Sequence, residues 1–284
     1  MKKITVLILF IASTIVSQTN TEVFLFDIKK TETGYELTNK KNISTNEGYD
    51  SQPHFYDNYA ILFASSRNGQ TDIVKYTIDT GIKEFINYSP EGGEYSPQRI
   101  PGTDDISAVR LDNTGLQRFY KYDINTGNSK EIIRNLEVAY PLWASNKLLF
   151  SAVIGDKSLE LVKSDLKNKT NVLLEKKIGR SLHSIPSTNS ISFISKKKPS
   201  WEIFSIDITT LTINKITNLN GNYEDIAWIS KDVVLQAKKN QLLQFNIKTD
   251  SVWKELINKD SLQIQNISRI TISPDRTKIA IVGE

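Results

Sequence analysis

One element recurs six times along this sequence of 284 residues, and it constrains the fold more than any other feature. The element is an apolar residue, a short polar turn and a second apolar strand. Its six copies begin at Phe55, Ile100, Trp143, Ile185, Trp228 and Ile272. Successive copies lie 45, 43, 42, 43 and 44 residues apart. A repeat of this length indicates supersecondary units that cannot bury both faces alone and must stack on one another.

A second element follows each of the first five copies. It is an alternating strand that ends in Asp or Asn and runs into a polar turn, over residues 74–81, 120–127, 161–166, 203–208 and 242–247. Alternation with β-branched and aromatic residues is typical of strands, and no window keeps a helical period. Two strand pairs in about 43 residues are typical of one propeller blade. The sequence therefore predicts an all-β fold, a six-bladed β-propeller.

The sixth copy is incomplete, because after Ile272 only one more strand, 279–282, precedes the end at Glu284. Two strands at the other end, 23–29 and 34–39, have the missing pattern. We therefore expect the last blade to be closed by N-terminal strands that pair with C-terminal strands. Such closure limits exposed sheet edges. Residues 19–284 are then a single propeller domain.

The first 18 residues read as a secretory signal peptide. Lys2 and Lys3 precede an apolar run over 4–16, which is short for a membrane span. The sequence thus predicts an exported protein, periplasmic or secreted, with no membrane span after signal removal. It contains no cysteine, which excludes disulfides and thiolate metal sites. The net charge of +4 is spread over interspersed charges, which argues against a nucleic-acid partner.

Two stretches resemble a known repeat. The segment ISPDRTKIAI at 272–281 resembles the WSPDGxxIAF core of the TolB-like (WD40-like, PD40) β-propeller repeat. The segment ILFASSRNGQTDI at 61–73 resembles the same family's FxSxRxGxxDIY stretch. The resemblance implies a propeller that acts in the cell envelope. TolB proteins also carry an N-terminal α/β domain, which this sequence does not predict. Related propellers precede serine hydrolase domains, but the sequence has no Gly-x-Ser-x-Gly motif.

Carboxylates and tyrosines precede several inner strands, at what should be one mouth of the central channel. The carboxylates are Asp50, Glu94, Glu137, Glu224 and Asp225, and the tyrosines are Tyr49, Tyr95, Tyr140 and Tyr223. An acidic ring can bind a cation or a basic peptide, or supply a catalytic acid pair. A tyrosine rim can bind a peptide or a glycan. The simpler alternatives are solvated loop carboxylates and tyrosines packed between blades.

The sequence has only two histidines. His183 lies two residues before the repeat start at Ile185, where it can face the channel. His54 is adjacent to Phe55, so strand alternation predicts that it points the other way. Two histidines in different blades are a poor ligand set, and we expect no metal and no cofactor. The recurring Asp27, Asp123, Asp165 and Asp207 are predicted to form turns.

Three hypotheses for function remain. The first is a non-enzymatic, monomeric module that binds a protein or peptide, or acts as a scaffold, through the channel mouth. Its predicted residues are Tyr49, Asp50, Glu94, Tyr95, Glu137, Tyr140, His183, Tyr223 and Glu224. The alternative is a polysaccharide lyase or hydrolase that uses channel-mouth carboxylates as acid and base. The third is a structural subunit of an envelope complex.

Overall fold

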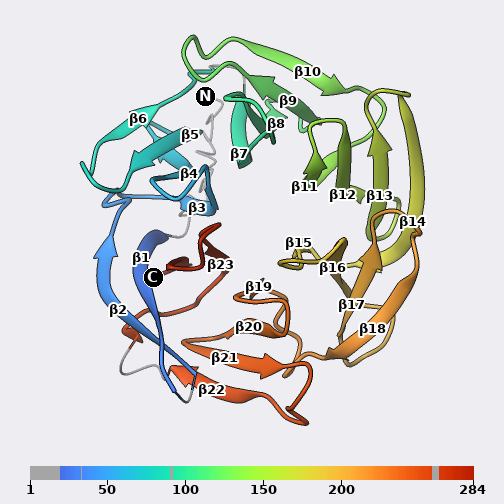
Figure 1. The fold of residues 1–284 in the computed structure, drawn as a ribbon. Coiled ribbons are helices and arrows are strands. Elements are labelled where there is room, and N and C mark those ends of the chain that lie inside the picture. Colours follow the sequence, from blue (N-terminus) through green and yellow to red (C-terminus); the bar gives the residue numbers. More distant parts are fainter. Residues whose placement is uncertain (1–19, 33, 90–91, 258–261) are drawn as a thin grey trace, which may run out of the picture.

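The strands are arranged as a ring around a central axis (Figure 1). The structure, a computed structural model, describes residues 20–32, 34–89, 92–257 and 262–284. The predicted signal segment 1–18 lies outside these residues. The described residues form 24 β-strands. Together with the ring arrangement, this confirms the prediction of an all-β propeller.

Two sheets follow one another along the first half of the chain, each an antiparallel meander that runs from the axis outward. The first contains β3 (Asp50–Phe55), β4 (Ala60–Arg67), β5 (Gln70–Thr77) and β6 (Lys83–Phe85). The second contains β7 (Gly92–Arg99), β8 (Ile106–Asp112), β9 (Gln117–Tyr122) and β10 (Ser129–Ile133).

The next eight strands form one hydrogen-bonded sheet made of two meanders. One contains β11 (Val138–Ser145), β12 (Leu148–Ile154), β13 (Leu159–Asp165) and β14 (Thr170–Ile178). The other contains β15 (His183–Ser184), β16 (Ser190–Ser195), β17 (Glu202–Asp207) and β18 (Ile213–Asn218). The meanders meet through one pair, Ile178 of β14 with Ser195 of β16.

A further meander precedes the sheet that unites the two ends of the chain. The meander contains β19 (Ile226–Trp228), β20 (Val233–Lys238), β21 (Gln241–Asn246) and β22 (Lys254–Ile257). The last sheet has the order β2-β1-β24-β23. Its strands are β1 (Glu22–Lys30), β2 (Tyr35–Asn42), β23 (Arg269–Ile272) and β24 (Lys278–Gly283). Residues 22–27 of β1 are antiparallel to 278–283 of β24.

Alternation along β1 and β24 explains why this last sheet packs against two neighbours. Val23 and Val282 face Phe63 of the β3–β6 sheet in one apolar cluster. Phe26 and Ile279 face the β19–β22 sheet in another cluster. Side chains on a strand alternate between the two faces of a sheet, so one strand supplies both contacts. The core is thus a series of apolar layers between sheets, rather than one central core.

Aspartates close several of the outer hairpins, as predicted. The Asp123 carboxylate accepts hydrogen bonds from the backbone N–H groups of Asn125 and Thr126, at 3.0 and 2.9 Å. Asp165 and Asp207 bind backbone N–H groups two or three residues later in the same way. These hydrogen bonds favour the ionised carboxylate and lower the pKa of all three side chains.

Asp27 differs from this prediction. It lies within β1, which continues to Lys30, so the turn comes later in the chain. Its carboxylate instead binds the side chains of Asn39 and Lys278, and these partners lower its pKa. The aspartate therefore connects three strands of the last sheet.

The first prediction concerns Phe26, which is 3% exposed in the layer between the last sheet and β19–β22. Phe26→Ala should lower the free energy of unfolding by about 3–5 kcal/mol, because it leaves a cavity in a packed layer. Urea unfolding followed by circular dichroism measures the loss. The control Val252→Ala changes a side chain that is 65% exposed and should have little effect. Equal stability of the two variants would show that the layer does not form.

Candidate functional site

A cavity of about 260 Å³ lies on the axis of the ring. It is lined by residues of the six innermost strands, β3, β7, β11, β15, β19 and β23, by the segments that lead into them, and by Arg276 after β23. Each innermost strand brings a short polar or aromatic stretch to the axis. The repeat therefore places residues from six distant parts of the sequence around one space.

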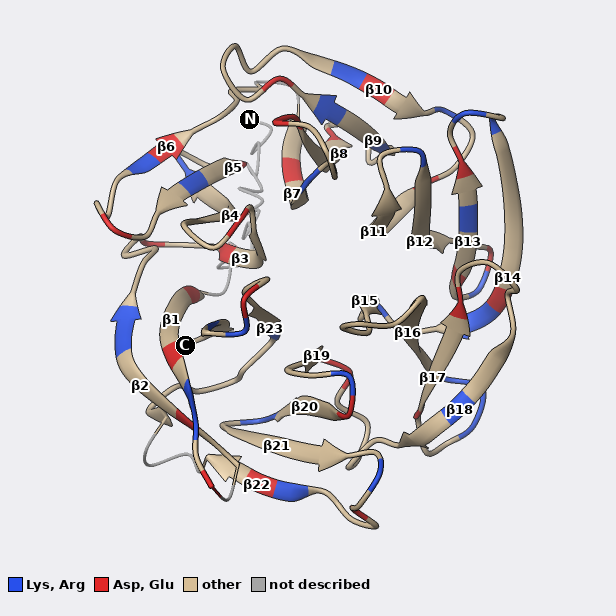
Figure 2. Cartoon of the chain, viewed as in Figure 1, with Lys and Arg blue, Asp and Glu red and all other residues tan. Residues whose placement is uncertain are grey.

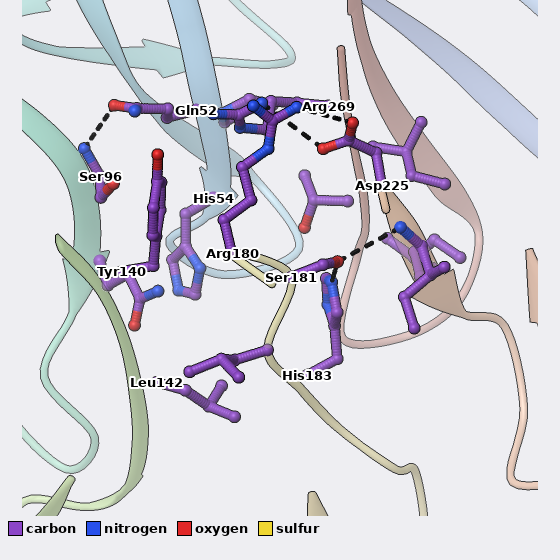
Figure 3. A pocket seen from close by; sticks show the side chains of 18 of the residues that line it. Gln52, His54, Ser96, Tyr140, Leu142, Arg180, Ser181, His183, Asp225 and Arg269 are labelled. Carbon is purple, nitrogen blue, oxygen red and sulfur yellow. Dashed lines mark hydrogen bonds and ion pairs between the residues drawn. The ribbon is translucent and has the colours of Figure 1, made fainter. Parts of the chain in front are cut away.

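Six residues of the lining, one from each innermost strand, occupy equivalent positions in the strand pairing. Each pairs with the second or third residue of the next strand in its sheet. They are His54, Gln98, Leu142, His183, Ala227 and Thr271. A second set comes from the start of the inner strands and the residues just before them, namely Gln52, Ser96, Tyr140, Arg180, Ser181, Asp225 and Arg269. Figure 3 shows most of these side chains around the cavity.

Both histidines line the cavity, so the prediction that His54 points away from it is wrong. Alternation holds at this point, because His54 and Phe55 pair with consecutive residues of β4, and Phe55 packs in the core while His54 lines the cavity. The turn after β3 is one residue shorter than that after β15: Tyr56 N–H binds the Ala60 carbonyl, whereas Ile185 N–H binds the Ser190 carbonyl. His54 and His183 consequently occupy the same ladder position.

The environment keeps both imidazoles neutral at physiological pH. Burial lowers the pKa of each histidine to about 4, and the neighbouring His54 adds to the effect on His183. His183 Nε2 lies 2.8 Å from Ser181 Oγ, and Ser181 Oγ also accepts a hydrogen bond from Ile226 N–H. The tautomer of His183 decides which of the two groups donates this hydrogen bond. Among the described residues, no three His, Cys, Asp or Glu side chains are grouped so as to hold a metal ion.

Arginines dominate the charge of the cavity. The lining contains Arg180, Arg269 and Arg276 but only one acidic residue, Asp225. Arg180 Nη2 lies 2.8 Å from Asp225 Oδ2, and Arg269 Nη1 lies 3.5 Å from Asp225 Oδ1. Burial raises the pKa of the Asp225 carboxyl, whereas the two arginines oppose this shift. Elsewhere on the ring, acidic and basic residues are interspersed (Figure 2).

The predicted acidic ring does not form around this cavity. Glu94 is fully buried and accepts hydrogen bonds from Arg110, Asn87 and Tyr122 at 2.8, 2.8 and 2.9 Å. Asp50 is also fully buried, and neither carboxylate lines the cavity. These two acids thus belong to polar networks inside the packed ring.

Two further predicted acids, Glu137 and Glu224, also stay out of the lining. Glu137 is exposed, and Glu224 pairs with Lys196 at 2.9 Å and with Arg180 at 3.6 Å. Asp225 is the one predicted mouth carboxylate in the lining of the axial cavity.

The tyrosines are brought together in part. Tyr49 and Tyr95 meet edge to face, with ring centroids 6.1 Å apart. Tyr95 and Tyr140 line a smaller cavity of about 190 Å³, and Tyr140 also lines the axial cavity. The Arg269 guanidinium lies 5.9 Å from the centre of the Tyr140 ring. Tyr223 is half-buried and lines neither of these cavities.

Of the nine residues predicted for the mouth, the axial cavity is lined by Tyr140 and His183. Sequence reasoning missed the arginines and the glutamines Gln52 and Gln98. A signal was present for Gln52 and Arg269, because positions 52, 96, 140, 225 and 269 recur in phase with the repeat, at steps of 44, 44, 85 and 44 residues.

No family model and no curated protein matches the sequence. Solved structures do match. A protein assigned as a TolB from Agrobacterium tumefaciens has 13% identity and a TM-score of 0.70, over 93% of this chain and 98% of that chain. TolB from Acinetobacter baumannii has 14% identity and a TM-score of 0.57, over 94% of this chain and 65% of that one.

A third similar structure is an oligogalacturonate lyase in complex with manganese. It has 11% identity and a TM-score of 0.59, over 88% of this chain and 82% of that chain. At these identities the likeness defines the fold alone. The chain therefore has the fold of a TolB-like β-propeller, as its repeat motifs indicate, and neighbours with this fold have different functions.

The second prediction concerns Asp50, whose Oδ2 accepts a hydrogen bond from Asn46 while Oδ1 has no partner among the described residues. Burial raises its pKa to about 6. The folded protein then binds more protons than the unfolded one between about pH 4 and 6, so stability falls as the pH rises through this range. The full loss above pH 6 is about 3 kcal/mol at most.

Asp50→Asn should therefore raise the free energy of unfolding at pH 7.5 by about 1–3 kcal/mol and have little effect at pH 4. Urea unfolding at both pH values measures the difference. The control Asp156→Asn changes an exposed carboxylate and should be as stable as the native chain at each pH. A variant that is destabilised at pH 7.5 would show that the buried charge is compensated.

Proposed function

We propose that this chain is an exported propeller of six blades that binds a protein or peptide partner at one mouth of its channel. The observation that carries the proposal is the shared lining of one axial cavity by six innermost strands. Six blades follow if β11–β14 and β15–β18 are counted separately, since one residue pair joins them. The pairing of β1 with β24 supports ring closure by the two ends of the chain and a single domain over 19–284.

The chemistry of the mouth supports binding. Tyr49, Tyr95 and Tyr140 lie together beside Arg269. Tyrosine and arginine are enriched where interfaces obtain most of their binding energy, because each combines a large flat surface with hydrogen-bonding groups. In the described residues no helix is long and apolar enough to cross a membrane. TolB-like neighbours and the leader pattern at 1–18 support export to the periplasm or beyond, and we propose that the mature chain is a monomer.

The hydrolase or lyase alternative requires a different set of groups from those predicted. An acid–base pair of carboxylates needs two carboxyl groups that converge on one space. The axial lining provides Asp225, while Asp50 and Glu94 are engaged in buried networks. The nearest approach to a nucleophile with its base is Ser181 and His183, and the low pKa of His183 makes it a weak base at pH 7.

The third prediction tests the binding mouth. A tagged mature chain, residues 19–284, should retain a specific partner from an envelope extract, and the triple variant Tyr49→Ala, Tyr95→Ala and Tyr140→Ala should lose it. The double variant Tyr59→Ala and Tyr88→Ala removes rings that are 66% and 70% exposed and should retain it. Mass spectrometry identifies the partner, and circular dichroism verifies that each variant folds. Equal capture by all three proteins, or no capture by any, would contradict the proposal.

A further inference from the structure

The axial cavity has a surplus of positive charge that the described residues do not neutralise. Arg180 and Arg269 share the single carboxylate of Asp225. Arg180 has a second, longer contact with Glu224, which is itself paired with Lys196. Both histidines are neutral at physiological pH and do not change this balance.

Arg276 reaches the cavity from the turn between β23 and β24 and has no carboxylate within ion-pair distance among the described residues. Its Nη1 donates a hydrogen bond to the Trp228 carbonyl at 3.4 Å. Burial lowers the pKa of this guanidinium, and the charge of the adjacent Asp275 opposes this shift without forming an ion pair. A partly desolvated arginine without an ion-pair partner is unfavourable unless something else supplies the negative charge.

A second arginine of the lining, Arg180, has an N–H group without a hydrogen-bond acceptor among the described residues. Arg180 Nε is buried and has no hydrogen-bond partner among the described residues, because the Glu224 oxygen nearest to it lies 3.6 Å away. Buried donors are nearly always paired in folded proteins, so such a group needs an acceptor. Guanidinium groups bind carboxylates through two parallel N–H bonds, so three arginines in one lining suit an acidic ligand.

We propose that the axial cavity binds the carboxylates of an acidic peptide segment through Arg180, Arg269 and Arg276. The inference rests on the proposed function, because it names the chemistry of the partner that the mouth accepts. A cavity of about 260 Å³ is smaller than most ligand sites, so it takes one or two acidic side chains or a chain end. The rest of the segment lies on the tyrosines of the mouth, Tyr49, Tyr95 and Tyr140.

Asp225 has a defined part in this arrangement. In the free protein it holds the Arg180 and Arg269 guanidinium groups in place (Figure 3). An incoming carboxylate competes with Asp225 for the same donors and is repelled by its charge. Removal of this one acidic side chain should therefore strengthen binding of an acid, whereas removal of the arginines should weaken it.

The fourth prediction uses fluorescence polarisation with labelled hexaglutamate and the mature chain. Arg180→Gln and Arg269→Gln should each weaken binding about tenfold or more at low salt, and added salt should weaken binding to the native chain. Asp225→Asn should strengthen it severalfold. The control Arg134→Gln removes a guanidinium that is 86% exposed and should leave the affinity unchanged, although it alters the net charge equally.

Arg276→Gly separates binding from folding. Arg276 has a φ of 66°, a conformation that glycine adopts without strain. This variant should keep or raise the melting temperature while it weakens hexaglutamate binding severalfold. The variant remains informative if Arg180→Gln fails to fold.

No binding of hexaglutamate would overturn the inference, and so would an equal loss of binding in Arg134→Gln. If hexaglutamate does not bind but an oligouronide of the same charge does, the site is assigned to an acidic glycan. If the partner from the envelope extract binds the arginine variants as well as the native chain, the inference fails while the proposed function stands. If hexaglutamate binds as expected and no partner is captured, the proposed function fails while the inference that the cavity binds carboxylates stands.

Discussion

The packing of each sheet against two neighbours is the constraint on which this structure depends. A four-stranded sheet with apolar residues on both faces cannot fold alone, because one face would remain in water. In the last sheet, Val23 and Val282 pack towards β3–β6, and Phe26 and Ile279 pack towards β19–β22. Because side chains alternate along β1 and β24, these two strands bury apolar residues on both faces of the last sheet. The axial cavity exists because sheets arranged in this way surround an axis.

The sequence predicted the parts of the fold that follow from period and alternation. The spacing of the repeats located the inner strands, and the aspartates that end the second strand pairs located the turns at Asp123, Asp165 and Asp207. The pairing between residues 22–27 and 278–283 follows from the incomplete last repeat. These features depend on local composition and on the regular spacing of apolar residues, and a single sequence shows both.

The site was predicted much less well, for two physical reasons. The first is that bulges change which side chains face the axis. Gln52 and Ser96 have φ values of 56° and 50° within the bulged strands β3 and β7, and Gln52 Oε1 accepts a hydrogen bond from Ser96 N–H. Alternation read from the sequence cannot show such a bulge. The sequence also cannot show that the turn after β3 is one residue shorter than that after β15, and this difference placed His54 on the wrong face.

The second reason is that the sequence does not reveal how charges are paired. Glu94 is a mouth carboxylate by position, but Arg110 and Tyr122 hold it inside the packed ring, whereas Asp225 remains at the axis between Arg180 and Arg269. The sequence predicted an acidic ring, but the ion pairs leave a cavity that is lined by three arginines and one aspartate. Positive φ is common in this chain, so the conformation of Arg276 alone does not indicate a function. Its significance comes from a guanidinium that lines the cavity beside two others, with one carboxylate among the three. The sign of that charge favours anionic groups at the axis, because a like charge placed beside these arginines is unfavourable.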